Sequence, residues 1–395
     1  MGFSYYQKIK TGYHEINCDN MARIYCNHLN ILKRIFIPSV CLWFIFLPDA
    51  YAASPDRIDF PSLVSSLRID TPLKFCEEEV PVNNQEVRER LEKEILLSLW
   101  DRPQIILWLK RSKRYLPYIE KTLKQNGLPD DLKYMAIAES ALRPHAGSEK
   151  GAMGFWQFVA GTGKKYGLII DENIDERRNI FASTAAAVKY LKDLHKQFSS
   201  WTLAAAAFNM GEDGLTAEIL EQGTDDYYKL YLPLETQQYI FRILSVKLIF
   251  TDPEKYGFNL TANDYYPPLT FDKVKVNCPQ EIPIRIIAQA GKTHFKVIKD
   301  LNPEIRGYYL SKGKHNILVP KGASDGFQAR YRDYVKKYVS AQKEQIYIVK
   351  KGDNLSNIAE KFDVPLKNLL IWNHIDINHS IHPGERLIIN RNKNK

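Results

Sequence analysis

The sequence predicts a mainly α-helical domain followed by two small α+β modules, and two patterns carry this prediction. Between residues 84 and 260, apolar residues recur at the three- and four-residue spacing of amphipathic helices. From residue 268 onwards, short alternating runs typical of strands flank short helical runs, and this strand–helix–helix–strand order occurs twice. A chain of 395 residues is long enough for two or three such domains.

Residues 1–52 have the pattern of a cleavable signal peptide. Lys33-Arg34 precede the apolar run Ile35–Leu47, which at 13 residues is short for a bilayer span, and Ala50-Tyr51-Ala52 suits a cleavage site. The extension before this run is long, so Met21 is an alternative start. The surroundings of Cys41 differ from those of a lipid-accepting cysteine. We therefore expect an exported protein without a lipid anchor.

The net charge indicates which kinds of partner the protein could bind, and the cysteines indicate whether a disulfide or a metal site could form. The net charge is +9, and +7 without the first 52 residues, which favours an anionic polymer such as a cell wall or a nucleic acid. No RRM, KH or zinc-finger pattern is present, so nucleic acid is the weaker choice, and a basic surface kept for solubility is the alternative. Cys76 and Cys278 would remain after signal removal, either bridged or free. No His or Cys spacing predicts a metal ion, and no cofactor is expected.

The helical region begins after a lead-in at residues 53–83. Residues 84–125 predict two helices, interrupted at Arg102-Pro103, that would brace the domain. Further helices are expected over Thr184–Leu194 and Trp201–Phe208, and another begins at Glu235.

The most informative stretch is residues 127–168. Pro129 and the acidic residues after it suit a helix N-terminus, and Leu132, Met135 and Glu139 then share one face of that helix. A carboxyl group on an apolar face should have a raised pKa, as a general acid near neutral pH needs. The alternative is an ordinary surface pair between Glu139 and Arg143. Pro144 predicts that the helix ends shortly after Glu139.

A run of small residues follows this helix and ends in Phe155-Trp156-Gln157. Together Glu139-Ser140, Ser148, Gly151-Ala152 and Gly154–Gln157 resemble the signature of the lysozyme-like lytic transglycosylases of the SLT family. The run Ile174–Arg178 is similar to the membrane-bound lytic murein transglycosylase D type, and the resemblance covers about residues 84–252.

The resemblance implies a lysozyme-like catalytic domain at residues 84–260 that cleaves peptidoglycan. In this family one glutamate, here Glu139, serves as both acid and base, and the product is a 1,6-anhydro sugar. Phe208 stands where the family has a tyrosine, and Tyr239 belongs to a motif that begins at Glu235. The implied substrate-binding residues are Ser140, Ser148, Trp156 as a hydrophobic wall, Gln157, Phe208, Asn209 and Tyr239.

The C-terminal region contains an internal repeat at residues 268–321 and 346–390, separated by a polar connector at residues 322–345. The spacing from Ile287 to Asn302 equals that from Ile358 to Asn373. The second copy resembles the LysM module, with Y-x-V-x-x-G-D-x-L, W-N and P-G-x-x-L patterns. The first copy lacks the G-D-x-L loop, so its sugar binding is doubtful. The family's glycan-binding loops correspond to Gly352, Asp353, Asn354 and Leu355, and to Asp376, Ile377 and Asn378.

The expected partner is therefore peptidoglycan in the periplasm, with neither nucleic acid nor stable membrane insertion. Two alternatives stay open. A goose-type lysozyme-like hydrolase would need an acidic partner for a water molecule, and Asp171, Glu172 and Asp175 are candidates in sequence. A non-catalytic wall-binding scaffold is the other, for which Phe208 counts slightly.

Overall fold

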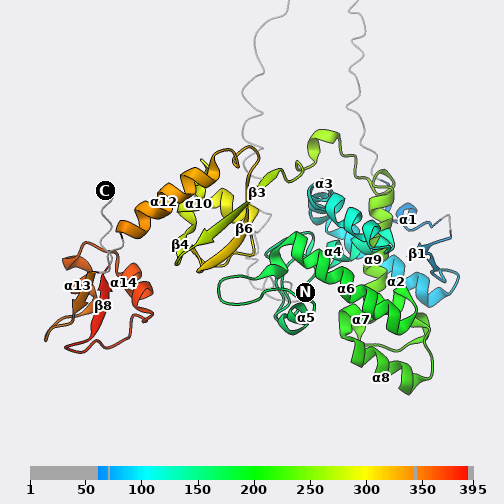
Figure 1. Cartoon of the computed structure of the whole chain (residues 1–395). Coiled ribbons are helices and arrows are strands. Elements are labelled where there is room, and N and C mark those ends of the chain that lie inside the picture. The colour runs from blue at the N-terminus through cyan, green and yellow to red at the C-terminus, as the bar shows by residue number, and fades with distance from the viewer. Residues whose placement is uncertain (1–60, 70–71, 342–344, 390–395) are drawn as a thin grey trace, which may run out of the picture. The chain divides into compact units, whose positions relative to one another are not determined.

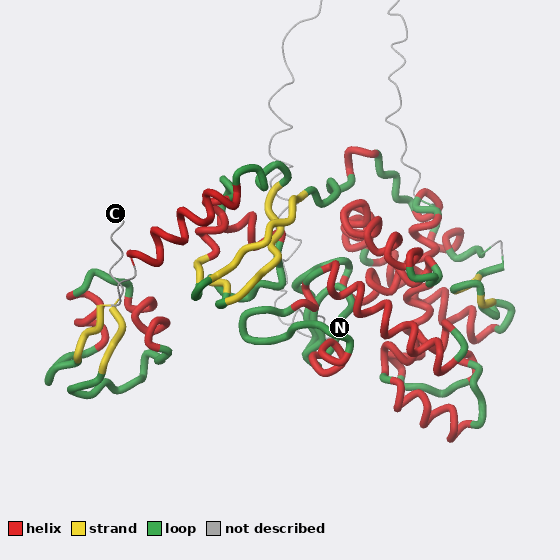
Figure 2. Tube along the Cα trace, in the orientation of Figure 1, coloured by secondary structure: helices red, strands yellow, loops and turns green. Residues whose placement is uncertain are grey.

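The computed structural model describes residues 61–69, 72–341 and 345–389. The predicted signal peptide and the charged tail at residues 390–395 lie outside them. Figure 2 shows that the chain is mainly helical up to α9, whereas the later modules each pair strands with short helices. No helix in the described ranges combines the length and apolar character that crossing a membrane requires.

Within residues 61–69 and 72–83, the described part of the N-terminal lead-in, the structure has one short helix and one small antiparallel strand pair, which the sequence did not predict. Phe75 is buried in the main core beside the following helices. Cys76 and Cys278 are both free thiols, so the possible disulfide between these two cysteines is not formed. The Cys278 Sγ atom lies 3.4 Å from the Tyr331 hydroxyl. These elements are α1 (Leu63–Ser66), β1 (Lys74–Phe75) and β2 (Glu78–Glu79).

The large domain has one continuous apolar core built by packed helices (Figure 1). Local sequence sets their ends: the Asn84 side chain accepts from two backbone N–H groups at the start of α2, and Asp101 caps α3 before Pro103. The break predicted at Arg102-Pro103 is confirmed. The longer helices are α2 (Gln85–Trp100), α3 (Arg102–Gln125), α6 (Ile180–Phe198), α7 (Trp201–Met210), α8 (Glu212–Gln222) and α9 (Leu234–Thr251).

Two of these helices differ from the prediction. Helix α8 was not predicted, and α6 begins at Ile180 rather than Thr184 because the side chain of Asn179 caps it. Shorter helices complete the domain. The helix α4 (Lys133–Ser140) packs against α3 and α9. The remaining short helices are α5 (Ala160–Lys165), η3 (Asp130–Leu132), η4 (Glu176–Arg178), η5 (Tyr227–Lys229), η6 (Glu254–Tyr256) and η7 (Ala262–Asp264).

The first α+β module has its own core and a long antiparallel pair, β3 with β6, in which Phe271 faces Pro320 and Cys278 faces Gly313. The helix over residues 327–341, in the expected connector, buries Phe327 and Tyr331 in this core, so much of that segment is part of the module. The elements are β3 (Phe271–Cys278), β4 (Ile282–Pro283), α10 (Ile284–Ala290), α11 (Phe295–Leu301), β5 (Tyr309–Leu310), β6 (Gly313–Pro320) and α12 (Phe327–Ala341).

The second module has a separate core and the simpler order strand, helix, helix, strand. An asparagine makes the same contacts in both copies. The Asn302 amide donates to the Ile298 and Leu318 carbonyls and accepts from the Leu318 N–H, and Asn373 does so with Leu369 and Ile388. The two residues are therefore structural equivalents. The elements are β7 (Gln345–Ile348), α13 (Leu355–Lys361), α14 (Leu366–Asn373) and β8 (Arg386–Ile389).

Candidate active site and glycan-binding module

Glu139 lies in the last turn of α4, a helix in which four consecutive residues from Tyr134 to Ile137 are buried. Its carboxyl group is only partly exposed and accepts a hydrogen bond of 2.5 Å from the Tyr239 hydroxyl. Burial raises the pKa of Glu139 to about 7, against the opposing effects of the Tyr239 bond and the Arg242 charge. The raised pKa expected from the apolar face is confirmed.

The ordinary surface pair with Arg143 is not what the structure has. The Arg143 guanidinium donates instead to the backbone carbonyl of Ser140, at 3.1 Å. Helix α4 ends where expected, because Ala141 and Leu142 both adopt positive φ angles just before Pro144. Glu139 thus lies just before an abrupt turn of the backbone at the end of a buried helix, which limits the positions that its carboxyl group can take.

Helices α7 and α9 bring the more distant candidates to the same region. Tyr239 is buried on α9 with its hydroxyl on Glu139. One turn earlier, Thr236 donates to the Asn209 side-chain oxygen at 2.9 Å, which links α9 to the end of α7. Glu235 is exposed and forms an ion pair of 3.4 Å with Lys150. Helix α9 therefore joins the site: its Tyr239 bonds to Glu139 on α4, and its Thr236 bonds to Asn209 on α7.

The loop from Gly147 to Phe158 carries the other candidates. Ser148 accepts from the Ala152 N–H at 3.0 Å, which closes a tight turn. Gln157 has a positive φ of 49°, and its side-chain N–H group donates to the Ala146 and Gly154 carbonyls. Both hydrogen bonds use the amide N–H group. Among the described residues the side-chain carbonyl oxygen of Gln157 accepts no hydrogen bond.

Two predicted substrate contacts, Trp156 and Ser140, are buried, whereas Phe208 is partly buried and packs against the same core. Trp156 has 0% exposure and donates to Thr184, so it cannot stack on a sugar as a wall. The buried Ser140 hydroxyl bonds to the Ala136 and Phe155 carbonyls, which ties α4 to the loop. Phe208 packs edge-on against Trp156. These side chains fill the space between helices that converge on the site, and a local motif cannot distinguish this support from direct contact.

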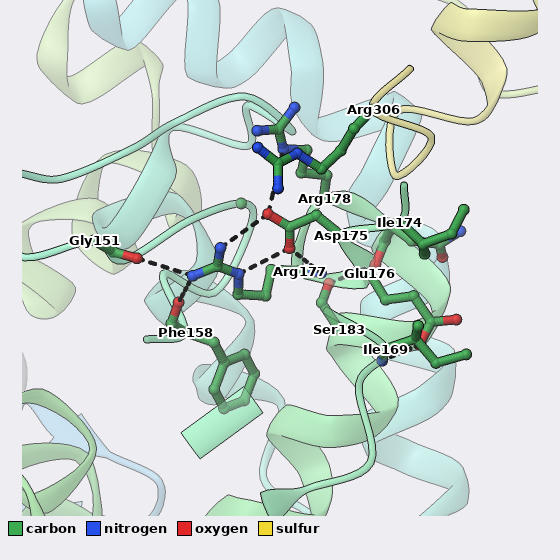
Figure 3. Close-up of polar contacts among 12 residues, drawn as sticks. Gly151, Phe158, Ile169, Ile174, Asp175, Glu176, Arg177, Arg178, Ser183 and Arg306 are labelled. Atoms are coloured by element: carbon green, nitrogen blue, oxygen red, sulfur yellow. Dashed lines mark hydrogen bonds and ion pairs between the residues drawn. The ribbon is translucent and has the colours of Figure 1, made fainter. Parts of the chain in front are cut away.

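A buried ion pair between Asp175 and Arg177 supports the loop from Gly147 to Phe158 (Figure 3). The Asp175 carboxylate accepts from Arg177 Nε at 2.8 Å and from Nη2 at 2.9 Å, while Nη1 donates to the Gly151 and Phe158 carbonyls. A Cβ on Gly154 would lie 1.8 Å from the Arg177 carbonyl oxygen. Arg177 belongs to the run Ile174–Arg178 that resembles the family, but its burial and its contacts with the loop carbonyls were not predicted. A charged run usually lies in solvent, so its pattern alone does not predict such contacts.

In the second module, the predicted glycan loops lie around the ends of its strands. The Asp353 carboxylate accepts from Tyr347 and from the Lys350 N–H, both at 2.8 Å, while Asn354 caps α13. Leu355 is a core residue rather than a surface contact. In the other loop, Ile377 is 68% exposed on a turn that Asp376 closes by accepting from Asn378. Gly352 is exposed with a positive φ.

Known families match two parts of this chain. Residues 117–231 match the family described as transglycosylase SLT domain, and residues 347–390 match the LysM domain. The chain contains an SLT domain and a LysM domain. Glu139, Gln157 and Asn209 all lie within the SLT match, and Tyr239 follows it. The expected family resemblance and the expected fold class are confirmed.

Similar proteins extend this result. Membrane-bound lytic murein transglycosylase D of Escherichia coli K12 is 31% identical over 293 residues, covering 71% of this chain and 64% of that protein. This chain therefore spans less than two thirds of that relative. A putative tributyltin chloride resistance protein of Alteromonas sp. M-1 is 36% identical over 110 residues, or 27% of this chain and 53% of that one. The 70 kDa soluble lytic transglycosylase of Escherichia coli shows 17% identity and a TM-score of 0.33, covering 47% of this chain and 31% of its own.

Proposed function

We propose that this protein is an exported lytic transglycosylase that cleaves the MurNAc-β-1,4-GlcNAc bond of peptidoglycan and leaves 1,6-anhydro-MurNAc ends. Glu139 is the observation that carries the proposal. Its partly exposed carboxyl group has a pKa of about 7, so it can both deliver and recover a proton near neutral pH. The SLT and LysM matches support a peptidoglycan substrate. The signal-like pattern before residue 53 supports export to the periplasm.

In the proposed mechanism, one carboxyl group acts twice. The protonated Glu139 gives its proton to the glycosidic oxygen as the bond from that oxygen to C1 of MurNAc breaks. The resulting carboxylate then takes the proton of the C6 hydroxyl as O6 bonds to C1. The proton count balances and no water is consumed. Tyr239 holds the carboxyl group, and the amide oxygen of Gln157 and the Asn209 side chain are suited to position the sugar.

The alternative hydrolase needs a second carboxylate to activate water. Asp175 is only 2% exposed and is engaged by Arg177. The Asp171 Oδ1 atom accepts from the backbone N–H groups of Asn173 and Ile174, at 2.8 Å and 2.7 Å. Of the three candidates, Asp171 and Asp175 are engaged within their own loop and Glu172 is exposed, so two of the three are occupied, which favours the single-carboxylate mechanism.

Mass spectrometry of the fragments released from purified sacculi tests the proposal. We expect fragments that end in 1,6-anhydro-MurNAc. Hydrated reducing ends would favour the lysozyme-like hydrolase, and a complete absence of fragments would favour a wall-binding scaffold. Either of those results contradicts the proposed function.

Tyr239→Phe should extend activity to higher pH. The Tyr239 bond favours the charged carboxylate and so lowers the pKa of Glu139, which means that its loss raises this pKa above about 7. Because the general acid must be protonated, wild-type kcat/KM should fall as pH rises through about 7, and the variant's should fall at a higher pH. Carboxyl ¹³C NMR titration of Glu139 measures the pKa directly.

The matched control is Tyr227→Phe. The Tyr227 hydroxyl is buried in the same domain but donates to the Thr236 and Gln237 carbonyls. We expect the Glu139 pKa to stay unchanged in this control. A Tyr239→Phe variant whose Glu139 pKa falls or stays constant would contradict the electrostatic role of Tyr239.

Deletion of residues 345–395 should weaken binding to insoluble sacculi but spare cleavage of short soluble glycan strands. This segment has its own core, so the rest of the chain keeps its packing. A module bound to the same polymer keeps the catalytic domain near scissile bonds, and such tethering can raise overall avidity by roughly 100-fold or more. Pull-down on sacculi and kcat/KM on soluble strands measure the two effects, with the melting temperature as control. Equal losses on both substrates would contradict a tethering role.

A further inference from the structure

The segment between α11 and β5 in the first module contacts the SLT domain. The Asp175 N–H donates to the Glu304 carbonyl and the Arg306 N–H donates to the Asn173 carbonyl, each at 2.8 Å. Between these bonds, Ile174 and Ile305 form an antiparallel β-bridge. Figure 3 shows Arg306 beside the Asp175–Arg178 cluster. Residues 304–306 therefore act as a short added strand on residues 173–175.

The repeat identifies what this segment corresponds to in the second module. The equivalence of Asn302 with Asn373 pairs Ile305, Arg306 and Gly307 with Asp376, Ile377 and Asn378. The second copy's turn is exposed. In the first copy, by contrast, Ile305 is 2% exposed and the backbone is occupied by the SLT domain.

We infer that the first repeat uses its counterpart of the glycan-binding turn to hold residues 171–175 of the SLT domain, and so positions the active-site loop instead of binding a sugar chain. This inference rests on the proposed function for its effect on turnover. The contact itself is independent of that function.

Several contacts reinforce the docking. The Ile174 side chain packs against the first module's core, and Arg306 Nη1 donates to the Asp171 carbonyl at 3.2 Å. At a second point, the Phe181 ring meets Phe271 edge-on with centroids 5.5 Å apart. Backbone bonds, an apolar side chain and an aromatic pair together restrict the loop more than one contact could.

A short series of hydrogen bonds connects the docked segment to the active-site loop. Asp175, whose N–H group bonds to the module, binds Arg177, and Arg177 holds the carbonyls of Gly151 and Phe158. Gln157 lies between these two anchor points. Displacement of a positioning group by about 1 Å can lower the rate by up to roughly 100-fold. Release of the module should therefore lower kcat, although the docked segment lies outside the residues that we propose to position the sugar.

The test compares Ile174→Asn with Ile169→Asn in the full chain. Ile174 packs on the module's core, whereas Ile169 belongs to the same loop but is 55% exposed. Ile174→Val serves as the conservative rescue. Hydrogen exchange of the Asp175 and Arg306 amides reports docking without any need for activity. Turnover of soluble glycan strands reports positioning, and the melting temperature reports global folding.

We expect slow exchange of both amides in the wild type, in Ile169→Asn and in Ile174→Val. In Ile174→Asn, both amides should exchange at least tenfold faster, and kcat should fall about tenfold with little change in KM. β-1,4-linked N-acetylglucosamine oligomers should slow exchange at residues 376–378 but not at residues 305–307. A wild type that cleaves no glycan would contradict the proposed function, while the exchange data would still decide the docking.

Three results would overturn the inference. The first is wild-type Asp175 and Arg306 amides that exchange as fast as exposed ones. The second is an Ile174→Asn variant that releases the segment yet keeps its kcat. The third is protection of residues 305–307 by the sugar oligomers. If Ile174→Asn unfolds the whole chain, the wild-type exchange rates and the oligomer experiment still decide.

Discussion

Glu139→Gln should lower turnover of peptidoglycan by at least about 100-fold while leaving the fold and sacculus binding intact. The substitution keeps the shape of the side chain and its contact with Tyr239 but removes the proton that the mechanism transfers. Product release measured by mass spectrometry gives the rate, and the melting temperature and sacculus pull-down give folding and binding. A variant with more than about a tenth of wild-type activity would exclude Glu139 as the general acid.

Glu235→Gln is the matched control for this experiment. Glu235 is the other carboxylate whose charge acts on the pKa of Glu139, yet it is exposed and paired with Lys150. In a mechanism with one carboxyl group, this variant should lose far less activity than Glu139→Gln. Comparable losses would instead indicate a pair of catalytic carboxylates, as in hydrolysis.

Gly154→Ala should be the most destabilising single methyl addition in the active-site loop. Gly154 has a φ of +82°, and a Cβ there would lie 1.8 Å from the Arg177 carbonyl oxygen. Left-handed backbone costs a non-glycine residue about 1–2 kcal/mol, and overpacking adds about 1–3 kcal/mol. We expect the free energy of unfolding to fall by roughly 3 kcal/mol, measured by denaturant titration.

Gly151→Ala separates the two contributions to this loss. Gly151 also has a positive φ, of +78°, but a Cβ there would meet no atom within 4 Å. Its variant should lose only the backbone cost of about 1–2 kcal/mol. Equal losses in the two variants would show that the close approach to Arg177 does not contribute.

Local sequence patterns were sufficient to predict those features of the fold that depend on residues close together in the chain. The break at Arg102-Pro103, the stop after Glu139 and the strand–helix–helix–strand repeat all follow from side chains within a few residues. The same holds for the raised pKa of Glu139, because helical spacing placed its carboxyl group on an apolar face.

Tertiary packing decided the remaining features, because each depends on residues far apart in the chain. No periodicity shows that Trp156 is buried against Thr184, that the Arg177 guanidinium replaces solvent with two loop carbonyls, or that Ile305 meets Ile174. The sequence by itself determined the catalytic candidate, most of the long helices and the repeat, since these follow from spacing and short-range contacts. Only the folded chain decided which side chains of the motif are buried in support of the loop and which stay accessible, since burial depends on what packs above each residue.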